Sequence, residues 1–312
     1  MSVINVTVKE KAGAAGVFVE EMGSINHHGG EVAGGGVVDM KQGSQTGPAN
    51  KKLLFRQFWQ GQLIEVIQEG PYRSLRFDSH LVQSRMLETN PDQLVLHYAQ
   101  HMIASLLFLA ESPIRILMIG LGGGTLARFF LSHYPKCKIK VVEYNECILP
   151  LAQKFFFLPK EDPRLSVVVA DGAQYISTTK PEHGGYDLIL VDAFDQTGMA
   201  QSVYSGLFFA GAKRLLAENG VMAVNMTRGE HAFFERAVEI LRGCFPDGLL
   251  RLPVDKTNNE VIITCQQPQA WGDWQQPKER AMVMSKQFDI DLVGFLEQIM
   301  PTGKGFWDRW LS

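Results

Sequence analysis

Short apolar runs alternate through the middle of the chain with segments whose apolar residues recur at helical spacing. The runs are typical of buried strands, and the spaced segments are typical of amphipathic helices. Strands that alternate with helices predict a doubly wound α/β fold, with a mostly parallel, Rossmann-like sheet. The expected strands are 114–120, 138–143, 165–171, 186–194 and 221–227, followed by a closing pair at 249–254 and 260–265. The expected helices are 125–134, 147–157, 173–179, 202–220 and 231–245.

The pattern differs on either side of this region. Residues 63–70 and 71–78 alternate as a β-hairpin that turns at Gly70 and Pro71, and 94–110 has helical spacing. Residues 1–50 are rich in glycine and small residues, which indicates a mobile segment. We therefore expect four parts: a mobile N-terminal segment (1–50), a small hairpin domain with a linking helix (51–108), a nucleoside-binding domain (109–268) and a helical extension (269–312).

Acidic or glycine-rich features follow the first four expected strands of the parallel sheet. In open α/β sheets, ligands bind beyond the carboxyl ends of the strands. One carboxylate at a strand end is often only a helix cap, but the group as a whole predicts a binding site. Its members are the glycines of 120–124, then Glu143, Asp171, Asp192 and Asp195.

The loop and its neighbours limit the kind of ligand. The loop has the form G-x-G-x-G, because Thr125 stands where a dinucleotide-binding loop has its third glycine, and no Walker lysine follows. Glu143 can accept hydrogen bonds from ribose hydroxyls. Carboxylates outnumber basic residues at the strand ends, which favours a cationic ligand. A sulfonium nucleoside meets all of these conditions.

Composition narrows the class of protein further. The net charge of −3 over 312 residues argues against a nucleic-acid partner. No apolar run approaches the roughly 20 residues of a membrane span, and no signal peptide is evident. The four cysteines are scattered, which predicts free thiols in a cytoplasmic protein without a structural metal.

Several segments together resemble the spermidine synthase (polyamine aminopropyltransferase) family, over about residues 63–265. The loop 120–128 is similar to the family's G-G-G-D-G-x-x-x-R, and 142–145 to its V-E-I-D. Residues 192–204 resemble its D-S-T-D-P-V-G-P-A-E-S-L-F without a gap. Further similar segments are 162–164 and 171–172, and an upstream stretch that places Gln83 in register.

The resemblance implies a site for decarboxylated AdoMet or AdoMet as co-substrate, and a small-molecule amine as acceptor. Glu143 would hold the ribose, and Asp171 with Gly172 the adenine. The backbone at Gly120, Gly122 and Gly124 would face the methionine-derived chain, and Gln83 would touch the nucleoside. Asp192, helped by Asp195, would bind and deprotonate the amine. The family also implies a homodimer.

The chain departs from the family pattern where the amine should bind. Gly123 stands where the family has the aspartate of its loop, and Tyr98 replaces a glutamate. Three readings remain open: an aminopropyltransferase, an AdoMet-dependent methyltransferase on the same scaffold, and a nucleoside-binding protein with little catalysis.

Overall fold

The computed structural model describes residues 51–78, 81–181, 184–195, 198–246, 248–266 and 274–302. The chain divides into two units, 1–47 and 48–312, and the first lies outside the described residues together with the expected mobile segment. Everything below concerns the second unit. The expected boundaries at 108/109 and 268/269 stay predictions.

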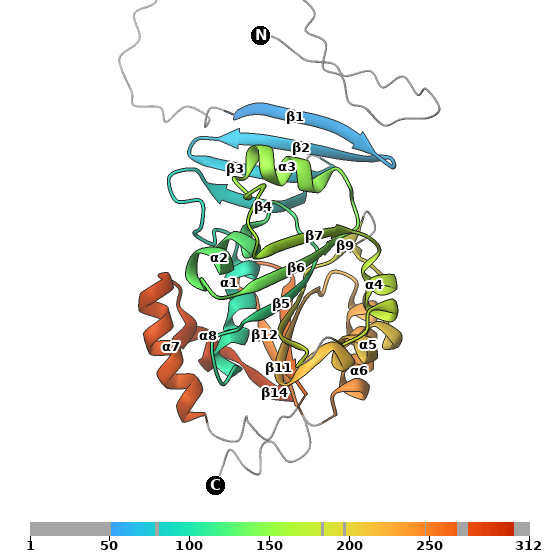
Figure 1. Ribbon diagram of the computed structural model, residues 1–312, viewed down its shortest axis with the longest axis vertical. Helices are drawn as coiled ribbons and strands as arrows, with labels where there is room; N and C mark the ends of the chain where they lie inside the picture. Colours follow the sequence, from blue (N-terminus) through green and yellow to red (C-terminus); the bar gives the residue numbers. More distant parts are fainter. Residues whose placement is uncertain are drawn as a thin grey trace, which may run out of the picture. The chain divides into compact units, whose positions relative to one another are not determined.

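An antiparallel sheet of four strands begins the described chain (Figure 1). The expected hairpin at Gly70 and Pro71 is confirmed as the turn between its second and third strands, and the first strand is an addition to the prediction. One face buries Ile64, Val66 and Leu75 completely. The strands are β1 (Lys51–Trp59), β2 (Gln62–Glu69), β3 (Tyr72–Phe77) and β4 (Leu81–Leu87), in sequential order.

The second sheet has eight strands in the order β14-β12-β13-β11-β8-β5-β6-β7, and its pairs from β11 to β7 are parallel. The chain leaves β5 toward β6 and β7 on one side, then returns to β8 on the other. This reversal beside β5 is where open sheets bind ligands. The strands are β5 (Arg115–Ile119), β6 (Lys138–Glu143), β7 (Leu165–Val169), β8 (Tyr186–Val191), β11 (Leu216–Thr227), β12 (Leu249–Pro253), β13 (Asn259–Cys265) and β14 (Met300–Thr302).

Helices cover both faces of this sheet, as the apolar strands require (Figure 1). Ile116 and Met118 of β5 belong to one apolar cluster, while Leu117 and Ile119 belong to the other. The first cluster includes α1 (His97–Met102), the 3₁₀ helix η1 (Ile103–Phe108), α2 (Thr125–His133), α3 (Ile148–Phe155), α7 (Gln275–Phe288) and α8 (Leu292–Gln298). The second includes α4 (Gly172–Thr178), α5 (Gly206–Leu215) and α6 (His231–Cys244). The doubly wound α/β prediction is confirmed.

Two helix predictions were wrong in detail. The expected helix 94–110 is split, because the backbone tightens from α1 into η1 at Ile103. The expected helix 202–220 ends at Leu215, since Leu216 already pairs with Tyr186 of β8. A short antiparallel pair, β9 (Phe194–Asp195) and β10 (Gly198–Met199), follows β8 and was not expected.

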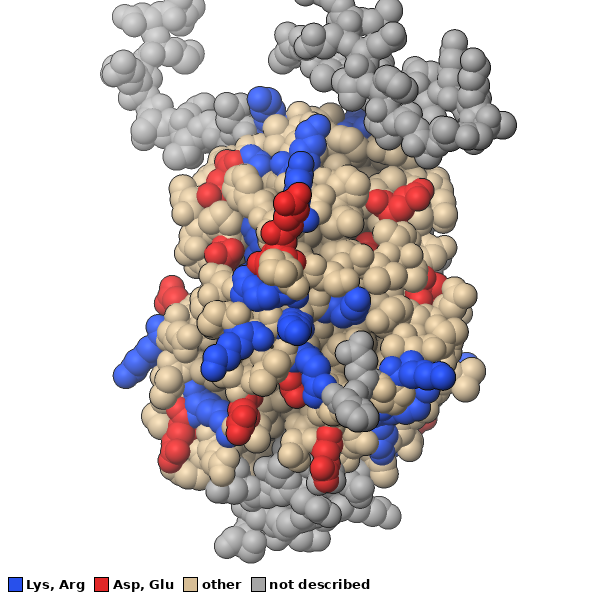
Figure 2. Space-filling view, in the orientation of Figure 1, with Lys and Arg blue, Asp and Glu red and all other residues tan. Residues whose placement is uncertain are grey.

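The surface mixes both signs of charge. On the face in Figure 2, basic side chains are most frequent across the middle, with acidic ones among them and around them. Within the described residues, no helix is long and apolar enough to cross a lipid bilayer.

Candidate active site

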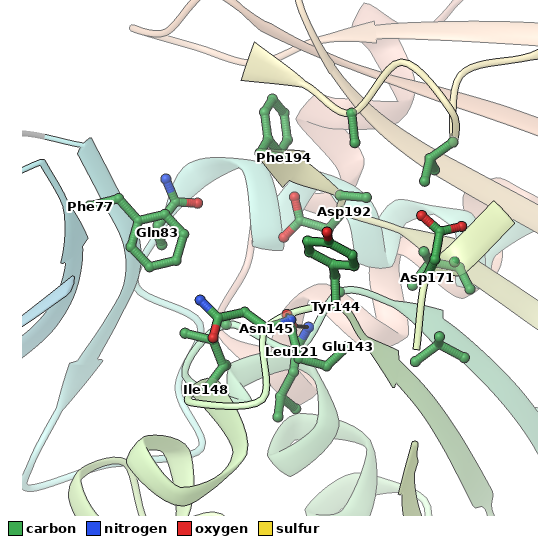
Figure 3. A pocket seen from close by; sticks show the side chains of 18 of the residues that line it. Phe77, Gln83, Leu121, Glu143, Tyr144, Asn145, Ile148, Asp171, Asp192 and Phe194 are labelled. Carbon is green, nitrogen blue, oxygen red and sulfur yellow. Dashed lines mark hydrogen bonds between the residues drawn. The ribbon is translucent and has the colours of Figure 1, made fainter. Parts of the chain in front are cut away.

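A cavity of about 470 Å³ opens at the carboxyl ends of β5, β6 and β8. Residues of the N-terminal sheet form its opposite wall. Figure 3 shows Asp192 near the centre of the cavity, with Asp171 on one side and Gln83 and Phe77 on the other. The lining includes Trp59, Gln60, Gln62, Phe77, Gln83, Gly120, Leu121, Gly122, Glu143, Tyr144, Asn145, Ile148, Asp171, Gly172, Asp192 and Phe194.

The glycine loop passes close to its neighbours with φ values that favour glycine. Gly120 has φ +97°, and a Cβ there would overlap the carbonyl oxygen of Asp192. Gly122 has φ +53°. Gly124, at φ +72°, packs against Leu158 and is not part of the lining. The structure therefore brings two of the three predicted glycines to the cavity and leaves Gly124 behind it, at the start of α2.

Position 123 has no room for a side chain. A Cβ on Gly123 would lie 2.9 Å from the Cβ of Ser84 and 3.1 Å from the ring of Phe156. The backbone N–H of Gly123 donates to the Ser84 hydroxyl at 2.7 Å. The space where the family's aspartate would begin is thus filled by β4 and by the end of α3.

Glu143, the last residue of β6, fastens the glycine loop to the sheet. Its Oε2 accepts the N–H of Leu121 and its Oε1 accepts the N–H of Asn145, each at 2.8 Å. Burial raises the pKa of this carboxyl, and hydrogen bonds from backbone N–H groups oppose the rise. The carboxylate lines the cavity, and both of its oxygens accept hydrogen bonds from backbone N–H groups.

Asp171 and Gly172 begin α4 at the end of β7. The Oδ1 of Asp171 accepts the N–H of Gln174 at 2.8 Å, so Asp171 is an N-cap as well as a lining residue. A Cβ on Gly172 would lie 2.7 Å from the Cγ2 of Ile119, which explains the close approach of α4 to β5. The cap and the cavity use the same side chain.

Asp192 follows β8 and is held by side chains from two other elements. Its Oδ1 accepts the side-chain N–H of Asn225 on β11 at 2.8 Å. The hydroxyl of Tyr98 on α1 lies close enough to influence the pKa of Asp192. Burial raises the pKa of Asp192, and the Asn225 hydrogen bond and the neighbouring Tyr98 hydroxyl oppose the rise. The side chain of Asp195, its predicted helper, lies outside the described residues.

Several proteins are similar to this chain in sequence and in fold. A family model described as the spermine/spermidine synthase domain matches residues 96–240. The polyamine aminopropyltransferase of Chromobacterium violaceum is 31% identical over 241 residues, which cover 77% of this chain and 90% of that protein. The chain belongs to the spermine/spermidine synthase family. The sequence-based prediction of this family, and of a transferase, is confirmed.

The chain is also similar to a methyltransferase and to two solved structures. The eEF1A lysine and N-terminal methyltransferase of Mus musculus is 32% identical over 169 residues, which cover 51% of this chain and 23% of that protein. A spermidine synthase structure in complex with the transition state analogue AdoDATO has a TM-score of 0.62 at 19% identity, covering 78% of this chain and 84% of that one. The structure of human methyltransferase-like protein 13 in complex with SAH has a TM-score of 0.52 at 24% identity. The match covers 68% of this chain and 97% of that one. The two structures establish the fold alone.

Sequence reasoning missed several side chains of this protein that line the cavity or lie next to Asp192. Gln62 on β2 is buried and lines the cavity, and its amide nitrogen has no hydrogen-bond partner among the described residues. Trp59 packs edge-on against Tyr144, and both residues line the cavity. Asn225 and Tyr98 stand behind Asp192. A strand pattern could have marked Gln62 as a polar residue in an apolar strand, but nothing local indicates where it points.

Among the described residues, no group of three or more His, Cys, Asp and Glu side chains gathers so that it could hold a metal ion. All four cysteines are free thiols.

Proposed function

We propose that this protein transfers an aminopropyl group from decarboxylated AdoMet to a small-molecule amine such as putrescine. The observation that carries the proposal is a carboxylate, Asp192, anchored in the same cavity as Glu143 and Asp171. The membership in the spermine/spermidine synthase family and the aminopropyltransferase relatives support it.

The nucleoside half of the cavity suits an AdoMet-type co-substrate. Glu143 would accept the ribose hydroxyls, as acidic residues at this strand end do. Asp171 would accept the adenine amino group, with Gly172 allowing a close approach. Gly120 and Gly122 would leave backbone open to the sulfur-bearing chain, and Gln83 would close the site from β4.

The amine half needs a base. An alkylamine has a pKa near 10 and arrives mostly as an ammonium ion at neutral pH. The carboxylate of Asp192 attracts that cation and accepts one of its protons. The freed nitrogen lone pair attacks the propyl carbon next to the sulfonium, the carbon–sulfur bond breaks, and its electron pair returns to sulfur. The products are a secondary amine and a neutral thioether nucleoside.

A methyl transfer from intact AdoMet is the second candidate, and one observation favours it. Ser84 and Phe156 fill the space beside Gly123, so no carboxylate at that position repels the carboxylate of AdoMet. The relative named as an eEF1A lysine and N-terminal methyltransferase is consistent with such chemistry on this scaffold.

Calorimetry with AdoMet, decarboxylated AdoMet and methylthioadenosine would separate the two candidates. We expect the decarboxylated form to bind more tightly than AdoMet and to be consumed when putrescine is added. A clear preference for AdoMet would overturn the proposal. Asp192→Asn should lower the rate of turnover by a factor of at least about 100. Asp162→Asn is the control, because Asp162 pairs with Arg164 outside the cavity.

The expected homodimer and cytoplasmic location complete the proposal. Family resemblance supports the first, and the scattered free thiols support the second. Sedimentation equilibrium of the full chain and fractionation of cells that express it would test them.

A further inference from the structure

A chain of polar side chains runs behind Asp192, on the side away from the cavity. Asn259 on β13 donates its side-chain N–H to the Oδ1 of Asn225 at 2.9 Å. Asn225 in turn donates its own side-chain N–H to the Oδ1 of Asp192 at 2.8 Å. Neither asparagine lines the cavity. Because an ionised carboxylate has no proton to donate, the order of donors and acceptors is fixed from the Asp192 end.

The ionised carboxylate of Asp192 can only accept, so the N–H₂ end of the Asn225 amide faces it, and the N–H of Asn259 satisfies the amide oxygen at the other end. If the Asn225 amide were turned over, its N–H₂ would face the N–H₂ of Asn259, and its oxygen would face the carboxylate. Both contacts are repulsive, so the present orientation is held. Asn225 is almost completely buried, which leaves no water to replace either bond. Oδ1 of Asp192 is consequently kept as an acceptor, and Oδ2 is the oxygen left to take a proton.

Tyr98 offers a hydroxyl with two acceptors. It donates to the carbonyl oxygen of Gln83 at 3.0 Å. Burial raises the pKa of Tyr98, and the neighbouring Asp192 carboxylate adds to the rise, which marks Asp192 as the second acceptor within its reach. A hydroxyl has one hydrogen and two lone pairs. It can donate to Asp192 while that group is an anion, because a charged acceptor makes the stronger bond. Once Asp192 is protonated, the hydroxyl can turn to Gln83.

We infer that Tyr98, Asn225 and Asn259 are positioning residues that hold Asp192 ready to accept the proton of the attacking amine. This rests on the proposed function, in which Asp192 is the base. Before transfer, Tyr98 and Asn225 both donate to the carboxylate. After transfer, the proton resides on Oδ2, Asn225 keeps its bond to Oδ1, and Tyr98 donates to the Gln83 carbonyl. The amine loses one proton, Asp192 gains it, and no other group changes its protonation.

Other titratable groups near Asp192 do not supply these bonds. Glu143 on β6 and Asp171 at the start of α4 face the same cavity, and each is bonded to backbone N–H groups. His97, on the same helix as Tyr98, is exposed, and His101 is buried against Phe295. The side chain of Asp195 is not described. Among the described residues, Asn225 donates a side-chain N–H to the Asp192 carboxylate, and Tyr98 is the other side chain close enough to lower its pKa.

The test measures the protonation of Asp192 directly and through catalysis. Carboxyl-carbon NMR titration of the free protein, with Asp192→Asn to assign the signal, gives the pKa of Asp192 without any substrate. We would compare Tyr98→Phe, Asn225→Ala and Asn259→Ala with two matched controls. Tyr134→Phe removes a hydroxyl at the far end of α2, where the ring packs near Phe288. Asn258→Ala changes the exposed neighbour of Asn259.

We expect the pKa of Asp192 to rise in all three variants, because each weakens donation to the carboxylate, and to stay unchanged in both controls. The acid limb of kcat/KM should move to higher pH in parallel, with kcat about tenfold lower for Tyr98→Phe, while calorimetric binding of methylthioadenosine stays the same. Asn259→Ala is decisive, since that residue does not touch Asp192.

An unchanged Asp192 titration in Tyr98→Phe and Asn259→Ala would overturn the inference. If Tyr98→Phe does not fold, the asparagine variants still decide. If the wild-type protein shows no transfer at all, the proposed function fails, yet the titration still reports whether these residues hold Asp192 as described.

Discussion

Replacing Glu143 with glutamine tests whether one carboxylate both shapes the loop and binds the nucleoside. In the wild type, its two oxygens accept backbone N–H groups of Leu121 and Asn145 at 2.8 Å each. Glutamine keeps one acceptor oxygen and presents N–H₂ to the other backbone donor. One buried N–H thus loses its partner, and leaving such a donor unpaired costs about 1–3 kcal/mol.

The same substitution also weakens the ligand site. A hydrogen bond to a charged group contributes about 1.5–3 kcal/mol, so losing the charge should weaken methylthioadenosine binding by roughly 10- to 100-fold. Urea unfolding would measure the first effect, expected as a loss of about 2 kcal/mol at an unchanged m value, and calorimetry would measure the second.

Asp162→Asn is the matched control for Glu143→Gln. The Oδ1 of Asp162 also accepts a backbone N–H, from Arg164 at 2.9 Å, but the residue lies outside the cavity. It should lower stability and leave binding unchanged. If Glu143→Gln binds methylthioadenosine as tightly as the wild type, the assignment of the ribose to Glu143 is refuted, whatever happens to stability.

Substitutions in the glycine loop and the pH dependence of turnover test the structure around Asp192 further. Gly120→Ala should prevent nucleoside binding and lower the melting temperature, because its Cβ would overlap the Asp192 carbonyl oxygen; a variant that binds normally in calorimetry would contradict this. Gly123→Asp should cost about 1–3 kcal/mol in urea unfolding through its contacts with Ser84 and Phe156, and adding Ser84→Gly should recover part of that loss; equal stability of the single variant and the wild type would be the opposing result. The kcat/KM should fall as the pH drops through the pKa of Asp192, which burial raises above the ordinary value of an aspartate; a pH profile whose acid limb lies where an exposed aspartate titrates would argue against Asp192 as the base.

The strand-end residues could be found from sequence because their placement follows from the backbone. Periodicity predicts parallel strands, and parallel strands end at one edge, so Glu143, Asp171 and Asp192 had to lie near one another. The structure places all three at one cavity. The same reasoning located Gly120 and Gly122, but it could not tell that Gly124 turns away to pack on Leu158.

Side chains from elements far apart in the sequence could not be found in this way. Asn225 reaches Asp192 only because β11 pairs with β8, and Asn259 reaches Asn225 only through the register of β11 with β13. The apolar spacing around Tyr98 predicts a helix, but it does not show where the α-helix ends and the 3₁₀ helix η1 begins. The direction of the Tyr98 side chain could therefore not be predicted. These contacts depend on the register between paired strands and on the position where α1 ends, and a single sequence determines neither.

The two halves of the cavity are therefore built differently, and this has a consequence for the chemistry. Glu143 and the glycine loop are fixed by backbone hydrogen bonds, so a substitution there disturbs the fold of the loop as well as the nucleoside. The surroundings of Asp192 are side chains from α1 and β11, which can change while the sheet stays intact. One scaffold can thus keep its nucleoside site and exchange its acceptor. Relatives named for aminopropyl transfer and for methyl transfer both match this chain, as that division predicts.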